Sequence, residues 1–210
     1  MQTRDLINAL AADTKTQAMP IGRVWWIALA AATVMAAIAF FLLIGPRPDI
    51  GQAAQTFRFL FKFIGTLMLT ISAFALLRAL SRPGAPLTAA WLLLAPALVG
   101  AAVVAELFIV PAERWGAVWW GTNVYVCLTF IPLIGFLPLV IMLAALRHGA
   151  PSRPGFAGAV SGLLAGGIAA TFYAAHCTDD SPLFVATWYT IAIAGLAAVG
   201  TILGRRLAPW

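Results

Sequence analysis

The chain has 210 residues, of which 62% are hydrophobic and 10% charged, and its mean hydropathy is +0.95. Because an ordinary soluble domain carries about a quarter charged residues, this composition excludes that class and indicates a membrane protein. The net charge of +6 comes with 13 lysines and arginines scattered at the ends of apolar runs. We therefore predict no direct contact with nucleic acid, which requires clustered basic residues.

Residues 1–23 form a polar leader ahead of the first apolar run. The apolar run is too long for the hydrophobic region of a signal peptide, so we expect it to be retained as a membrane anchor. Leu6, Ile7 and Leu10 fall on one face of a short predicted helix. Isolated helices of about three turns are marginal in water, so we predict that this face docks on a partner protein. The residues predicted to bind this partner are Asp5, Leu6, Ile7, Leu10 and Asp13.

Residues 24–210 contain six apolar runs that are long enough to cross a bilayer, since about 20 helical residues span roughly 30 Å of hydrocarbon. The predicted spans are residues 24–44, 59–77, 88–110, 119–146, 156–175 and 183–203. The predicted fold is therefore all-α: a polytopic six-helix transmembrane bundle with a short N-terminal cytoplasmic helix. Pro132 and Pro138 predict a kink or a tilt in the long fourth span.

The distribution of charge predicts how the bundle is oriented. With the N-terminus in the cytoplasm, nine of the 13 lysines and arginines lie on the inner side, as the positive-inside rule requires. The acidic residues Asp49, Glu113, Asp179 and Asp180 then all lie outside. We predict a multi-pass protein of the bacterial inner membrane, in contact with lipid, with both termini cytoplasmic.

Two ionisable residues fall within the predicted spans. Glu106, about one turn from the outer end of the third span, is a candidate for a proton or ion role and is expected to reach interfacial water. Lys62 lies at a similar depth and is expected to extend outward to water. A small transporter or channel that uses Glu106 and the glycine ridge of the fifth span (Gly158, Gly162 and Gly166) is the alternative function, although no second, deeper acid and no inverted repeat support it. A scaffold subunit of a larger membrane complex is a third class.

The two cysteines, Cys127 and Cys177, are predicted to lie toward the same outer side of the membrane, with His176 beside the second. Two hypotheses fit these residues. The pair can form a thiol–disulfide switch, or Cys127, Cys177 and His176 can bind a regulatory metal such as zinc or copper. The third interpretation is that both cysteines are small buried apolar residues. No other cofactor is expected.

Three glycines, Gly158, Gly162 and Gly166, are spaced four residues apart and form one ridge on the fifth predicted span. Packing within the bundle is the favoured interpretation, with a homodimer seam and a substrate-facing groove as alternatives. The sequence contains no P-loop, HExxH, GxSxG or dinucleotide-binding glycine pattern, so we predict that the protein is not an enzyme.

Several of these segments resemble one family of bacterial membrane proteins. They are the leader, with Asp5-Leu6-Ile7 and Leu10-Ala11-Ala12-Asp13, and the C-terminal third, with Gly162 to Gly166, Tyr173 to Ser181, Trp188-Tyr189 and Gly204-Arg205-Arg206. Together with Cys127 and the six spans, they resemble the NrsF-type family of membrane anti-sigma factors. The most specific part is His176-Cys177-Thr178-Asp179-Asp180-Ser181, where the family often has proline in place of Thr178.

The resemblance implies negative regulation of transcription in a stress response. It implies that the cytoplasmic leader holds an extracytoplasmic-function sigma factor at the inner membrane, and that the cysteine pair takes part in redox or metal sensing. Under this hypothesis, oxidation or metal capture at Cys127 and Cys177 ties the fourth span to the fifth and weakens the grip of the leader on the sigma factor.

Overall fold

The computed structural model describes residues 3–4, 21–82 and 89–207. Within these ranges the chain is helical and contains no strand, and six helices are long and apolar enough to cross a membrane. The predicted all-α, six-span fold is therefore confirmed. The leader residues Asp5, Leu6, Ile7, Leu10 and Asp13 lie outside the described residues, so their role stays a prediction.

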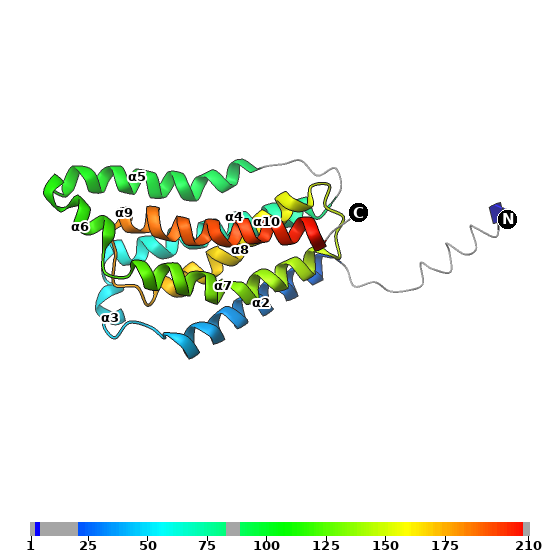
Figure 1. Cartoon of the computed structure of the whole chain (residues 1–210), viewed down its shortest axis with the longest axis horizontal. Helices are drawn as coiled ribbons and strands as arrows, with labels where there is room; N and C mark the ends of the chain where they lie inside the picture. The colour runs from blue at the N-terminus through cyan, green and yellow to red at the C-terminus, as the bar shows by residue number, and fades with distance from the viewer. Residues whose placement is uncertain (1–2, 5–20, 83–88, 208–210) are drawn as a thin grey trace.

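The six long helices run back and forth along one axis (Figure 1). Their bounds are α2 Ile21–Leu43, α4 Phe57–Leu80, α5 Leu94–Ile109, α7 Val124–Leu146, α8 Pro154–Ala174 and α10 Thr190–Leu207. Short helices lie between them: α3 Ile50–Ala53, α6 Trp115–Trp120 and α9 Pro182–Phe184. A 3-10 turn, Ala89–Leu93, precedes α5, another, Ala112–Arg114, precedes α6, and a π-helical turn, Val185–Tyr189, joins α9 to α10.

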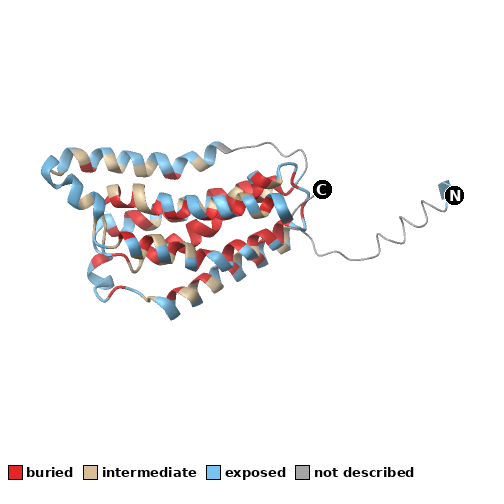
Figure 2. Cartoon of the chain, in the orientation of Figure 1, coloured by how far each residue is buried: buried red, intermediate tan, exposed pale blue. Residues whose placement is uncertain are grey.

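Helix α8 forms the centre of the bundle and packs against α2, α4, α7 and α10. In the most apolar 18-residue stretch of its span 67% of the residues are buried, whereas in that of the span containing α5 only 11% are. Figure 2 shows this contrast: buried residues gather on the inner helices, while α5 is exposed along most of its length. The small residues of α8 account for its position, because four helices approach it closely.

The three glycines of the predicted ridge face α10 of the same chain. A Cβ atom on Gly162 would lie 2.5 Å from the Ala197 Cα, and one on Gly166 would lie 2.8 Å from the Ile193 side chain. On Gly158 it would meet the backbone of Gly200. The ridge is therefore occupied by packing within the bundle, which leaves no space there for a second copy of the chain or for a substrate.

Substituting Gly162 with alanine is expected to destabilise the bundle by about 1–3 kcal/mol, because the added methyl group overpacks the contact with α10. Gly195 is a matched control, since it lies in α10 and, apart from its chain neighbours and the backbone of its own helix, no atom comes within 4 Å of the position that an alanine methyl group would take there. Gly195→Ala should be neutral or slightly stabilising, since alanine is the better helix former. Thermal unfolding of the detergent-solubilised protein, followed by tryptophan fluorescence, measures both. Equal melting temperatures for the two variants would contradict the conclusion that the glycine ridge packs closely against α10.

The fourth predicted span, residues 119–146, is broken near its start, which the hydropathy pattern did not predict. Helix α6 ends at Trp120, Gly121 has a positive φ of 60°, and α7 begins at Val124. Glycine takes this left-handed conformation without steric cost. A Cβ atom on Gly121 would also lie 2.7 Å from the Asp179 carboxyl carbon, so the break fits closely against the loop that follows α8.

Different segments of the chain form the two ends of the bundle. The start of α2 and the end of α10 lie together at one end, and the connections through α3, α6 and α9 lie at the opposite end (Figure 1). We call this opposite end the α9 end. Most of the buried polar side chains described below gather there.

Candidate functional site

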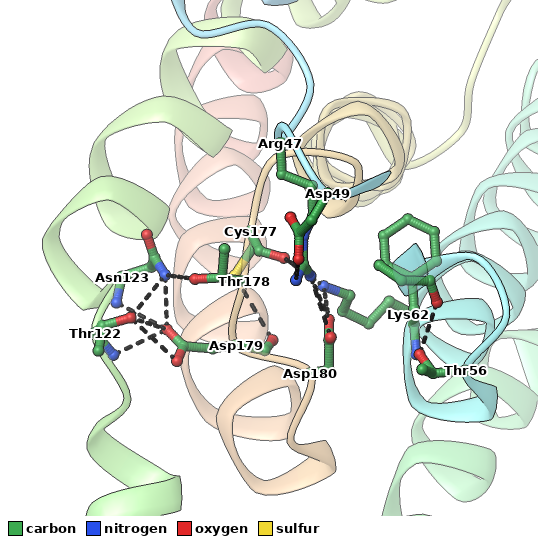
Figure 3. Close-up of polar contacts among 12 residues, drawn as sticks. Arg47, Asp49, Thr56, Lys62, Thr122, Asn123, Cys177, Thr178, Asp179 and Asp180 are labelled. Atoms are coloured by element: carbon green, nitrogen blue, oxygen red, sulfur yellow. Dashed lines mark hydrogen bonds and ion pairs between the residues drawn. The ribbon is translucent and has the colours of Figure 1, made fainter. Parts of the chain in front are cut away.

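The loop of residues 176–181, here called the Cys177 loop, is where polar side chains from several parts of the chain meet at the α9 end. It connects α8 to α9, and its sequence is His-Cys-Thr-Asp-Asp-Ser. Its partners come from the segment after α2, from α4 and from the break before α7 (Figure 3), and also from α5. A buried polar group is costly unless it is hydrogen-bonded, so this concentration of contacts fixes the loop.

Lys62, in the second turn of α4, turns into the bundle and binds the Cys177 loop. Its ammonium group donates to the Cys177 carbonyl oxygen at 2.8 Å and pairs with the Asp180 carboxylate at 2.5 Å. Its side chain has 0% exposure, so the expectation that Lys62 extends outward to water is wrong. The physical reason is that Asp180 supplies a counter-charge within reach, which a buried ammonium group requires.

Arg47, in the segment that follows α2, binds the same two groups. One guanidinium nitrogen lies 3.3 Å from the Cys177 carbonyl oxygen and 3.2 Å from Asp180. The other two nitrogens form a forked pair with Asp49, at 2.7 Å each. These hydrogen bonds from Arg47 hold the pKa of Asp49 below its usual value. Asp180 therefore lies between two cations, and the loop is tied both to α4 and to the end of α2.

The end of α2 makes two more contacts with this region. The His176 ring nitrogen Nδ1 lies 2.9 Å from the Gly45 carbonyl oxygen. The backbone N–H of Arg47 donates to the Ala175 carbonyl oxygen at 3.0 Å. His176 is thus engaged with the segment after α2 by one of its two ring nitrogens.

Asp179 points away from Asp180 and binds the start of α7 (Figure 3). Its carboxylate accepts from the backbone N–H groups of Thr122 and Asn123, at 2.9 and 2.8 Å, and from the Asn123 amide at 3.0 Å. The first N–H groups of a helix lack partners within the helix, and negative charge is favourable there. Asp179 therefore stabilises the break at Gly121 and the beginning of α7.

Glu106 attaches α5 to the loop. Its carboxylate accepts from the Ser181 hydroxyl at 2.7 Å and from the Leu183 N–H at 2.9 Å, and it lies 3.4 Å from Arg58. Glu106 is only 2% exposed, so the expectation that it reaches interfacial water is wrong. Ala95 and Glu106 are the buried residues of α5, and Glu106 is thus its main polar attachment. These contacts give the carboxylate a structural role that needs no transport pathway.

Cys127 and Cys177 are both free thiols with 0% exposure. Cys127 lies in the first turn of α7, directly after the segment that binds Asp179, so the two cysteines share the α9 end. The Cys177 thiol donates to the Asp179 carbonyl oxygen at 3.7 Å. Burial raises the pKa of the Cys177 thiol, with the positive charge of Lys62 acting in the opposite direction. The thiol is therefore protonated and weakly nucleophilic at neutral pH.

The metal-binding and disulfide hypotheses remain predictions. Across residues 21–82 and 89–207, no group of three or more His, Cys, Asp and Glu side chains is arranged to hold a metal ion. The structure brings Cys177, Asp179 and Asp180 into one polar network, with His176 directed toward the end of α2.

Sequence reasoning did not identify Arg47, Lys62, Thr122 and Asn123 as partners of the loop. Two signals were available. An ionisable residue within an apolar run is a candidate functional residue, which applies to Lys62 as much as to Glu106. Gly121-Thr122-Asn123 is a typical turn sequence within an apolar region and marks a helix boundary. Arg47 carried no comparable signal, since an arginine between two prolines in a loop is ordinary.

The six apolar helices and the ion-paired loop at one end define a polytopic membrane protein whose buried charged residues, Arg47, Lys62 and Glu106, all contact that loop. The family described as "Negative regulator of sigma F", NrsF, matches residues 10–210, and the chain belongs to this family. It is 35% identical to the "Anti-sigma-F factor NrsF" of Caulobacter vibrioides and 31% identical to the "Probable anti-sigma-F factor NrsF" of Azospira oryzae, each over the full length of both chains. The resemblance stated above is confirmed. No solved structure matches the chain.

Proposed function

We propose that this protein is an anti-sigma factor that holds an extracytoplasmic-function sigma factor at the bacterial inner membrane. The observation that carries the proposal is the family match over residues 10–210, together with full-length similarity to a protein named as an anti-sigma-F factor. Negative regulation by sequestration needs a binding segment and no catalytic site, so the protein is not an enzyme.

The leader is the proposed binding segment. Leu6, Ile7 and Leu10 occupy an apolar groove on the sigma factor, while Asp5 and Asp13 pair with basic residues around it. This arrangement requires a cytoplasmic N-terminus, which the excess of lysine and arginine on that side supports. The apolar side chains exposed along the helices, such as Phe41, Phe108 and Ile109, contact lipid.

Removing residues 1–20 tests the proposal directly. The sigma factor should co-purify with the full chain from solubilised membranes and should be lost when the leader is removed. The truncated chain retains every described helix from Ile21 onward, so it should still reach the membrane, and its abundance there is the control. Undiminished co-purification without the leader would contradict the assignment of the leader as the binding segment.

The cysteine pair is the proposed sensor of the signal that releases the sigma factor. Replacing Cys127 and Cys177 together with serine should preserve retention of the sigma factor and abolish its release on treatment with a thiol oxidant or zinc. Transcription from a promoter that depends on this sigma factor measures the response. Replacing both cysteines with alanine is the control, because alanine removes the thiols without placing serine hydroxyl groups in the buried positions. Normal induction in both double variants would remove the thiols from the mechanism.

A further inference from the structure

The Cys177 loop contains one of the two buried thiols and binds, through Asp179, the start of the helix that carries the other. Cys127 and Cys177 have 0% exposure, although both lie at the α9 end of the bundle and not in its middle. Thr178, by contrast, is exposed, and Asp179 and Asp180 are partly exposed. The outer side of the loop thus faces the surroundings of the bundle while its Cys177 side is closed.

The loop is fastened on both of its sides. Asp179 binds the backbone at the start of α7, and Asp180 binds Lys62 and Arg47 (Figure 3). Cys177 lies directly before these residues, and its own carbonyl oxygen accepts from both cations. The main chain at Cys177 therefore moves only if these contacts break.

The Lys62–Asp180 pair is the strongest of these fastenings. Lys62 has a side-chain exposure of 0% and lies 2.5 Å from Asp180, whereas Arg47, the other cation on Asp180, has an exposure of 9% and lies 3.2 Å away. Exposed ion pairs contribute little to stability. Removing Asp180 is far more costly, because the buried ammonium group of Lys62 then loses its counter-charge.

We propose that the Cys177 loop is a latch over Cys127 and Cys177, fastened by the Lys62–Asp180 ion pair, and that the latch opens before any oxidant or metal ion reaches either thiol. Its biological meaning rests on the sensing role proposed above, but access to the thiols is measured without a sigma factor. Local opening of this kind has its own free energy, separate from that of global unfolding.

The rate of alkylation by N-ethylmaleimide, a small uncharged thiol reagent, measures access. Membranes that contain the full chain are treated with the reagent, and peptide mass spectrometry follows Cys177 and Cys127 separately. Both should react slowly in the parent protein. In a Lys62→Met variant, Cys177 should react at least about tenfold faster, because the loop loses both the ion pair with Asp180 and the hydrogen bond to the Cys177 carbonyl oxygen. Arg78→Met, at the other end of α4, is the matched control and should leave the rate unchanged.

The direction of the change in alkylation rate distinguishes opening of the loop from a change in the pKa of the Cys177 thiol. The positive charge of Lys62 lowers the pKa of the Cys177 thiol, so its removal alone would reduce the thiolate fraction and slow alkylation. Faster alkylation in Lys62→Met therefore reports opening of the loop. Asp180→Asn, which preserves the size of the side chain, should accelerate the reaction in the same direction.

Thermal unfolding of each variant identifies effects of misfolding. Acceleration well below the melting temperature supports the latch, whereas acceleration confined to temperatures at which the bundle unfolds would overturn it. Alkylation of the parent chain as fast as in denaturing detergent would also overturn it, as would equal rates in the parent and both variants. If the rates follow the latch while the double cysteine variants still respond to oxidant, the sensing role fails and the latch stands.

Discussion

Replacing Leu6 and Leu10 with aspartate is expected to abolish retention of the sigma factor while leaving the six-helix bundle intact. Buried apolar anchors dominate most protein–protein interfaces, and the loss of one costs about 2 kcal/mol or more. Burying a carboxylate in an apolar groove adds a further desolvation cost. The fraction of the sigma factor that sediments with membranes measures the effect, and it should fall to the level seen without residues 1–20.

Asn8 and Ala12 provide the matched control for this experiment. They have the same spacing as Leu6 and Leu10 but lie on the opposite face of the predicted helix, so Asn8→Asp with Ala12→Asp adds the same charge away from the apolar stripe. This control should retain the sigma factor. Retention by the Leu6→Asp, Leu10→Asp variant would disprove the docking hypothesis, and loss in both would show that charge, not apolar contact, decides binding.

Glu106→Leu is expected to destabilise the bundle by about 2–4 kcal/mol. The substitution leaves the buried Ser181 hydroxyl and the Leu183 N–H without their acceptor, and each buried unsatisfied group costs about 1–3 kcal/mol. It also removes the main polar attachment of α5, a helix that is otherwise little buried. Unfolding in detergent, followed by tryptophan fluorescence, measures the change.

Glu113 is the control for Glu106, because it is an exposed glutamate in the 3-10 turn that follows α5. Glu113→Leu should change stability by less than about 0.5 kcal/mol, as is usual for exposed positions. A Glu106→Leu variant as stable as Glu113→Leu would show that apolar packing alone holds α5 in place.

Hydropathy was sufficient to predict the helices, because lipid leaves the backbone few alternatives to an internally hydrogen-bonded helix. It did not predict the break at Gly121. Hydropathy is averaged over a long stretch of sequence, so the apolar residues on both sides outweigh the few residues of the turn. The orientation of the Lys62 side chain could not be predicted from the sequence either. A lysine near the end of a span can extend to water or turn inward, and the choice depends on whether a neighbouring loop supplies a carboxylate.

The residues that bind the Cys177 loop could not be predicted from the sequence, because they are far from it along the chain. Arg47 and Asp180 are 133 residues apart, and only the packing of α2 and α4 on α8 brings them together. The glycines show the opposite case. Their spacing predicted a close helix contact, but the sequence left open which helix makes it, and the structure assigns it to α10.

Helix α2 gives the protein a short mechanical path from one side of the membrane to the other. It begins at Ile21, within the last residues of the leader, and Gly45 and Arg47, just past its last turn, contact the Cys177 loop. A helix of 23 residues is about 35 Å long and is stiff along its axis. We infer that this rod transmits a shift at one end to the other, so that a signal crosses the bilayer through a single continuous helix.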